Sequence, residues 1–225
     1  MSNQRTTLRE WAGASTAQVA LIFTDIVDST ALVNEMGDKR WIEVLIEHLS
    51  QARRALVNYD CYEIKFIGDS FMVAFRTTFE ALLFALALFA GTGHPKVKIR
   101  AGIHVGEVHI IENDMFGGMV NYTARVLKAA ADEEEWIVVS DYAKTQIVQA
   151  MGSKDSELLF ADMKVKLKGF DEPYKHKVWI VETRKMRHAA DAKRRRSWEK
   201  TRKDLGELLS DLSILMDEAM RQRNK

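Results

Sequence analysis

Apolar residues follow two spacings along the chain, and together they predict an α/β domain. Short, nearly continuous apolar runs predict buried strands at residues 19–25, 63–68, 70–75, 97–104, 107–111, 136–140, 163–167 and 176–182. Apolar residues at helical spacing predict helices at residues 41–59, 79–91, 120–131 and 141–150. Because strands and helices alternate while some strands are joined by tight turns, we expect a mixed sheet with helices packed on it.

Turn residues and changes of composition set the expected boundaries. The pairs Gly68-Asp69 and Val105-Gly106 each predict the turn of a hairpin. Residues 1–17 are expected to form a polar lead-in, residues 18–183 one folded domain, and residues 184–225 a basic linker and an amphipathic C-terminal helix. We expect that helix, at residues 203–221, to dock on the domain or on a second copy of the chain and to help hold a dimer.

The composition is that of a globular protein without a strong charge bias. Of the 225 residues, 47% are hydrophobic and 29% are charged, and the formal net charge is +1. We therefore expect neither a nucleic-acid nor a membrane partner. The single cysteine, Cys61, excludes a disulfide within the chain, and the first ten residues carry no apolar signal core. These features predict a cytoplasmic location.

Two aspartates lie at the ends of predicted strands. Asp25 ends the apolar run that starts at Val19, and Asp69 follows the run that starts at Glu63. Carboxylates brought together from neighbouring strands are hard oxygen ligands that suit Mg²⁺ or Mn²⁺. Such a site can activate an attacking oxygen and neutralise a leaving pyrophosphate, although a lone aspartate at a strand end is often only a turn or cap residue.

Four motifs, in order, carry a resemblance to a known family: Phe23-Thr-Asp-Ile-Val-Asp-Ser-Thr30, Lys65-Phe-Ile-Gly-Asp69, Arg100-Ala-Gly-Ile-His-Val-Gly-Glu107 and Gly117-Gly-Met-Val-Asn-Tyr-Thr-Ala-Arg125. With them, residues 19–182 resemble the catalytic domain of class III nucleotidyl (adenylate/guanylate-type) cyclases, of a short stand-alone bacterial type. The resemblance implies an α/β (α+β) domain around a ferredoxin-like mixed sheet and a homodimer with shared active sites. It also implies two Mg²⁺ or Mn²⁺ ions per active site, held by Asp25, Asp69 and the backbone carbonyl of Ile26.

The reaction implied by the resemblance converts a nucleoside triphosphate to a 3′,5′-cyclic nucleotide and pyrophosphate. Asn121 would orient the ribose, and Arg125 would stabilise charge on the phosphates in the transition state, where a planar guanidinium is well suited. The two residues are four apart, so they share one face of a helix. A lysine on a late strand would meet the triphosphate, and both Lys166 and Lys168 fit that position.

Base selection depends on two further matched positions. Lys65 and Asp114 occupy the positions that contact the base in adenylate-forming members, and a lysine donor with a carboxylate acceptor complements the edge of adenine. The resemblance also places Phe23 and Gly68 among the substrate-binding residues. The sequence therefore predicts conversion of ATP to cyclic AMP.

Three other interpretations stay open at this point. Some short cyclases of this class make cyclic UMP or cyclic CMP as an anti-phage defence signal, and this chain is similar to them in length. The domain could instead be a catalytically degenerate nucleotide-binding module, or mainly an interaction protein that works through its basic segment and terminal helix. His104 invites a catalytic role, but we expect it to be structural, and we assign no chemistry to Cys61.

Overall fold

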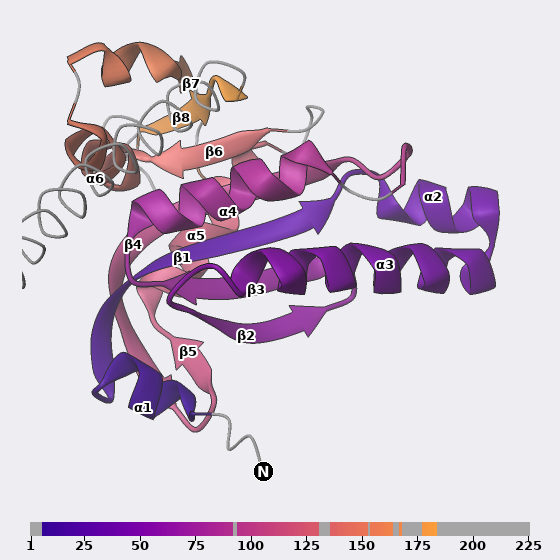
Figure 1. Cartoon of the computed structure of the whole chain (residues 1–225), viewed down its shortest axis with the longest axis horizontal. Coiled ribbons are helices and arrows are strands. Elements are labelled where there is room, and N and C mark those ends of the chain that lie inside the picture. The colour runs from indigo at the N-terminus through magenta and orange to yellow at the C-terminus, as the bar shows by residue number, and fades with distance from the viewer. Residues whose placement is uncertain are drawn as a thin grey trace, which may run out of the picture. The chain divides into compact units, whose positions relative to one another are not determined.

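The computed structural model describes residues 6–91, 94–130, 136–152, 154–163, 167 and 177–183. Within that part of the chain, eight strands form one mixed sheet in the order β2-β3-β1-β4-β6-β8-β7, with β5 paired to β4 (Figure 1). The strands are β1 (Thr16–Ile26), β2 (Cys61–Ile67), β3 (Ser70–Phe75), β4 (Ile99–Ile111), β5 (Asp114–Phe116), β6 (Ile137–Ser140), β7 (Phe160–Met163) and β8 (Val178–Val181). Neighbours are antiparallel except β4 and β6, which are parallel. The predicted α/β fold with a mixed sheet is confirmed.

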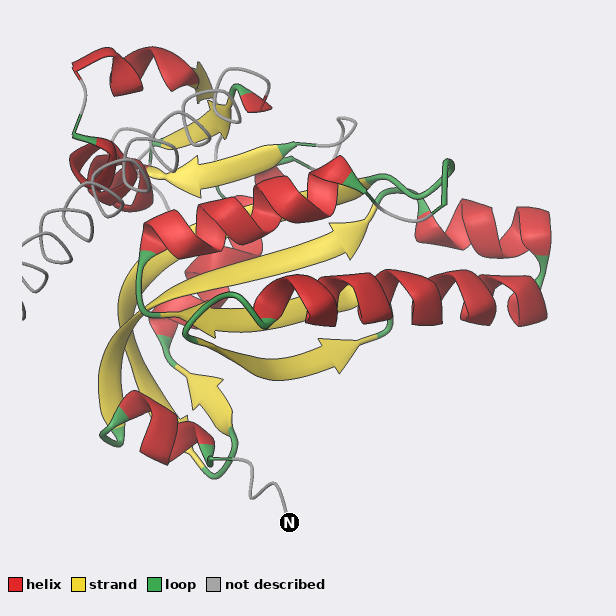
Figure 2. Ribbon diagram, in the orientation of Figure 1, coloured by secondary structure: helices red, strands yellow, loops and turns green. Residues whose placement is uncertain are grey.

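The helices lie on both faces of this sheet (Figure 2). They are α1 (Leu8–Ala12), α2 (Ser29–Met36), α3 (Asp38–Leu56), α4 (Thr78–Ala90), α5 (Gly118–Ala129) and α6 (Asp141–Met151). None of the helices in the described ranges is long and apolar enough to cross a membrane. The predicted C-terminal helix and the basic run before it lie outside the described residues.

Alternation along β1 explains how both faces of the sheet are buried. Val19 and Leu21 pack in one core with α1 and with Met119 of α5. On the opposite face, the ring centroids of Phe71 and Phe75 lie 6.4 and 5.4 Å, respectively, from the ring centroid of Phe84 on α4. Because side chains alternate across a strand, a central strand covered on both faces is a continuous apolar run. That run is why β1 was predictable from the sequence.

The predicted hairpin at Val105-Gly106 is wrong, because β4 is one continuous strand. Residues on β4 pair with β1 without interruption, from Thr16 opposite His109 to Ile26 opposite Ile99. Gly106 lies within the strand and packs closely on α5, since a Cβ atom there would lie 3.0 Å from Cγ of Met119. The chain reverses later, between β4 and β5, where Glu112 has a φ of 55°.

Two other boundaries also differ from expectation. The sequence predicts that Asp141 caps the helix expected at residues 141–150. Helix α6 is instead capped by the side chain of Ser140, which accepts a hydrogen bond from the backbone of Ala143. The strand expected at residues 163–167 is found at Phe160–Met163. Both differences shift an element by a few residues and leave the order of elements unchanged.

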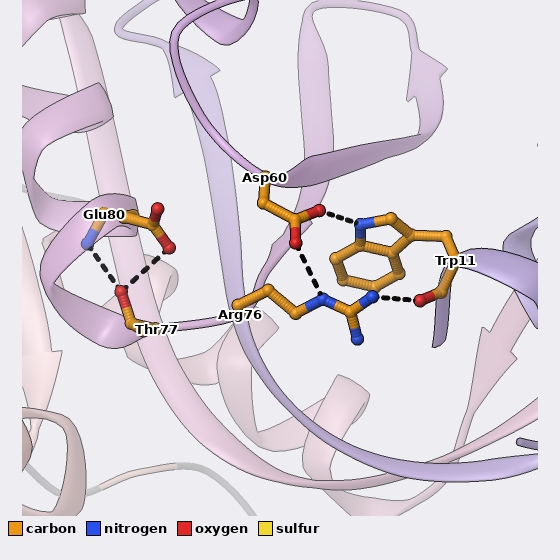
Figure 3. A network of polar contacts seen from close by, with 5 residues as sticks. All are labelled: Trp11, Asp60, Arg76, Thr77 and Glu80. Carbon is orange, nitrogen blue, oxygen red and sulfur yellow. Dashed lines mark hydrogen bonds and ion pairs between the residues drawn. The ribbon is translucent and has the colours of Figure 1, made fainter. Parts of the chain in front are cut away.

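A polar network fixes the base of the β2–β3 hairpin against α1 (Figure 3). The indole N–H of Trp11 donates to Asp60, just before β2, over 2.7 Å, and Arg76, just after β3, donates to the other oxygen of Asp60 over 3.1 Å. The Arg76 guanidinium also lies 4.3 Å from the centroid of the Trp11 ring and donates to the Trp11 carbonyl. The next residue, Thr77, caps α4 together with Glu80. The network therefore fixes both ends of the hairpin whose tip carries Asp69.

Candidate active site

The structure brings together the two aspartates that the sequence singles out. Asp25 lies near the end of β1, and Asp69 lies in the turn between β2 and β3, where Gly68 adopts a φ of 63°. The backbone N–H of Ile26 points to the Asp69 carboxylate at 3.4 Å. Burial raises the pKa of Asp25, and the nearby charge of Asp69 raises it further. Two carboxylates therefore lie close enough to repel each other at this edge of the sheet.

Arg100 is a residue of this site whose role was not predicted from the sequence. It lies opposite Asp25 in the β1–β4 pairing. Its Nε and one terminal nitrogen each donate to a different oxygen of Asp25, both over 2.9 Å. This contact opposes the effect of burial and lowers the pKa of Asp25. The only available signal was the presence of Arg100 in a matched motif, because 75 positions separate it from Asp25.

A buried histidine lies on the α3 side of the same site. His48 is 3% exposed, and its Nδ1 has no hydrogen-bond partner in the described structure. Burial lowers the pKa of His48, and the charge of Asp69 acts in the opposite direction. The signal in the sequence was its spacing, because His48 falls between Val44 and Ala52 on the buried face of α3.

Lys65 and Asp114, predicted to contact the base, form an ion pair. The ammonium of Lys65 on β2 lies 2.5 Å from Oδ2 of Asp114, the first residue of β5. Oδ1 of Asp114 accepts from the backbone N–H of Met115 over 2.8 Å, which fixes the carboxylate. Both side chains remain about one-third exposed, at 35% and 32%. A ligand can therefore reach a donor and an acceptor held side by side.

Helix α5 carries Asn121 and Arg125 and is fixed tightly to β4. A Cβ atom at Gly102 would lie 2.4 Å from the backbone nitrogen of Leu127, so only glycine permits this approach. Asn121 is exposed and Arg125 is half-buried. Lys128, on the last turn of the helix, is near enough to lower the pKa of Asp25. Close packing on the sheet thus holds the predicted ribose- and phosphate-binding residues in place.

The remaining predicted residues are placed as follows. Phe23 is half-buried and packs against the core that contains Leu21, and Gly68 forms the turn before Asp69. Lys166 and Lys168 lie outside the described residues. The functional roles assigned to all four stay predictions.

His104 and Cys61 have structural surroundings. Nδ1 of His104 lies 2.7 Å from Oγ of Ser140, and its ring centroid lies 4.5 Å from that of Tyr122 on α5. His104 therefore connects β4 to β6 and to α5. Burial raises the pKa of Cys61 to about 12, so its thiol is protonated and unreactive at neutral pH.

Comparison with known proteins identifies the family of this chain. Residues 12–182 match the model of the "Adenylate and Guanylate cyclase catalytic domain". The chain is 43% identical over 70 residues to the receptor-type adenylate cyclase GRESAG 4.2 of Trypanosoma brucei brucei, which covers 31% of this chain and 12% of that protein. It is 31% identical over 158 residues to an adenylate cyclase of Lachancea kluyveri, covering 56% of this chain and 8% of that protein. The chain thus spans about a tenth of the length of these relatives.

A solved structure has the same fold. The structure of adenylate cyclases from Trypanosoma brucei "in their monomeric state" superposes with a TM-score of 0.61 at 23% identity, covering 74% of this chain and 88% of that one. Identity at that level shows the fold alone. With the family match over most of its length, the chain belongs to the adenylate and guanylate cyclase catalytic domain family. The predicted resemblance to nucleotidyl cyclase enzymes is confirmed at the level of the family.

Proposed function

We propose that this chain is a nucleotidyl cyclase that converts ATP to 3′,5′-cyclic AMP and pyrophosphate. The observation that carries the proposal is the convergence of Asp25 and Asp69 from separate strands in a domain of the cyclase family. The 3′-oxygen of the ribose attacks the α-phosphorus, the bond from that phosphorus to the β-phosphate oxygen breaks, and the 3′-hydroxyl proton is lost. The adenylate cyclases among its relatives support ATP as the substrate.

The donors at the Asp pair fit a hard divalent cation. They are two carboxylates, and the backbone N–H of Ile26 lies 3.4 Å from the Asp69 carboxylate. We propose the carbonyl oxygen of Ile26 as a third ligand. No group of three or more histidine, cysteine or acidic side chains converges as a metal cluster within the described ranges. Substrate phosphates and water would supply the other ligands, as they commonly do for Mg²⁺. Bound Mg²⁺ or Mn²⁺ would lower the pKa of the 3′-hydroxyl and neutralise charge on the phosphates.

The other residues of the chain provide binding and charge stabilisation. Lys65 donates to the base and Asp114 accepts from it, while Asn121 orients the ribose. Arg125 stabilises the negative charge that develops on the α-phosphate, where a fixed guanidinium is most effective. We further propose that Asp25 and Asp69 of one protomer face Lys65, Asp114, Asn121 and Arg125 of a second, so that a homodimer contains two equivalent sites.

Product analysis tests the proposed substrate directly. We expect the purified chain, incubated separately with ATP, GTP, UTP and CTP in the presence of Mn²⁺, to form cyclic AMP as its main product, identified by mass. Cyclic UMP or cyclic CMP as the main product would instead favour a pyrimidine cyclase. The absence of any cyclic nucleotide would favour a degenerate binding module.

Exchange of the base-contacting pair tests how the base is selected. Lys65→Glu combined with Asp114→Cys should reduce kcat/KM for ATP and raise the relative use of GTP. Each lost hydrogen bond that leaves a buried polar group unpaired costs about 1–3 kcal/mol, or roughly 5- to 150-fold. The measurement is kcat/KM for each of the two nucleotides.

An exposed lysine–carboxylate pair provides the matched control. Lys96 pairs with Glu35, and both side chains are more than half exposed. Lys96→Glu combined with Glu35→Cys should leave the ratio of ATP to GTP use unchanged. If both double variants keep that ratio, base selection depends on other residues.

A further inference from the structure

The ion pair between Arg100 and Asp25 occupies the oxygens that a metal ion would need. Each oxygen of the Asp25 carboxylate accepts one guanidinium hydrogen bond, at 2.9 Å in both cases. The two side chains are only 15% and 21% exposed, so water screens the pair weakly. Bidentate, charge-assisted contacts of this kind are the strongest hydrogen bonds that proteins form. Arg100 is therefore the natural competitor of any cation at Asp25.

The fold fixes the backbone positions of this competitor. Asp25 and Arg100 are direct partners in the longest ladder of the sheet, the β1–β4 pairing, and their side chains lie on the same face. Gly102 lies on β4 two positions after Arg100, and its lack of a Cβ atom permits the close approach of α5. The backbone of Arg100 thus cannot withdraw, and only its side chain can move away from Asp25.

Electrostatics explains why a cation is needed at this point. Two carboxylates, Asp25 and Asp69, lie at the same edge of the sheet, and the Asp25 side chain is only 21% exposed. A guanidinium that cannot lose its proton supplies the missing positive charge. A divalent ion held by the Asp25 carboxylate would supply positive charge more strongly than the guanidinium does. The guanidinium and the ion repel each other and use the same carboxylate.

We propose that Arg100 is a positioning residue that occupies the Asp25 carboxylate until a divalent cation displaces it, so that Arg100 sets the metal affinity of the site. The inference rests on the proposed function, because it takes the Asp pair as the metal site. By linkage, the cation must weaken the Arg100–Asp25 pair by the same factor by which the pair weakens cation binding. If the pair is closed about nine tenths of the time, the apparent Kd for the cation is about tenfold above its intrinsic value.

Binding of Mn²⁺ to the full chain without nucleotide tests this inference separately from turnover. Arg100→Gln removes the charge and should bind Mn²⁺ about tenfold more tightly than the wild type, as measured by electron paramagnetic resonance of free Mn²⁺ at one fixed pH. Arg100→Lys keeps a positive charge and should remain closer to the wild type. Asp25→Asn should lose the binding, which places the bound ion at the Asp pair.

A second bidentate pair provides the matched control. Arg53 also donates through Nε and one terminal nitrogen to both oxygens of a carboxylate, that of Glu63 near the start of β2, and its side chain is 54% exposed. Arg53→Gln removes an equivalent ion pair, so its Mn²⁺ affinity should equal that of the wild type. A purely structural role for Arg100 would lower the Tm of Arg100→Gln and leave its Mn²⁺ affinity equal to that of Arg53→Gln.

The possible results separate this inference from the proposed function. Unchanged or weaker Mn²⁺ binding by folded Arg100→Gln overturns the inference while leaving the cyclase proposal standing. If Asp25→Asn binds Mn²⁺ as tightly as the wild type does, the Asp pair is not the metal site, and the inference is overturned as well. If Arg100→Gln does not fold, the wild type can be tested by NMR. Addition of Mg²⁺ should shift the Nε–H resonance of Arg100, which is assigned by its absence from the spectrum of Arg100→Lys. An unshifted resonance at saturating Mg²⁺ overturns the inference.

Discussion

Asp25→Asn and Asp69→Asn are each expected to reduce turnover by more than about 100-fold. Each substitution removes one negative ligand from a hard-cation site, and even residues that only orient a ligand typically cost 10- to 100-fold when removed. Asparagine has nearly the same shape as aspartate, so the fold should remain, but Asp25→Asn removes the ion pair with Arg100 and should have a lower Tm than Asp69→Asn. Turnover should be measured with saturating ATP and Mn²⁺, together with the Tm of each variant.

Asp38→Asn is the matched control for these two variants. Asp38 is exposed in the first turn of α3, and the same chemical change there removes no proposed metal ligand. It should turn over ATP as the wild type does. Wild-type turnover by either Asp25→Asn or Asp69→Asn would rule out the proposed metal site.

A mixture of two inactive variants is expected to regain activity. Asp69→Asn removes a metal ligand from one half of the proposed site, and Arg125→Ala removes the transition-state contact from the other half. In a mixed dimer, the Asp pair of the Arg125→Ala protomer faces the intact Arg125 of the Asp69→Asn protomer. Random mixing of equal amounts makes half of the dimers mixed, each with one intact site, so about a quarter of the wild-type activity should return.

A second mixture distinguishes shared sites from non-specific rescue. Asp25→Asn and Asp69→Asn damage the same half of the site, so their mixed dimer contains no intact site and should remain inactive. Turnover of both mixtures should be followed over time while native mass spectrometry records subunit exchange. Complete exchange with no recovered activity in the first mixture would show that each site belongs to a single protomer.

Local sequence patterns predicted the elements that carry the Asp pair. β1 and β3 are covered on both sides, so both are continuous apolar runs. The turn between β2 and β3 was marked by Gly68, whose positive φ suits glycine. The length and apolar character of α4 made that helix predictable in the same way. Each of these features depends on residues close together in the chain.

Glycine also caused the main error of the prediction. Gly106 was interpreted as a turn residue, whereas it lies within β4 and makes room for Met119. A glycine required by a distant helix and a glycine required by a turn have the same local sequence. Only the uninterrupted pairing of β4 with β1 distinguishes the two cases.

The sequence by itself determined the family, most of the strands and helices, and the residues matched to the proposed site, because these depend on local periodicity and motif spacing. The tertiary structure alone showed that Arg100 pairs with Asp25 and that Lys65 pairs with Asp114. The partners in these two contacts are 75 and 49 positions apart. Contacts at such separation depend on which strands become neighbours and in which register, and these follow from burial of the whole sheet rather than from any local pattern.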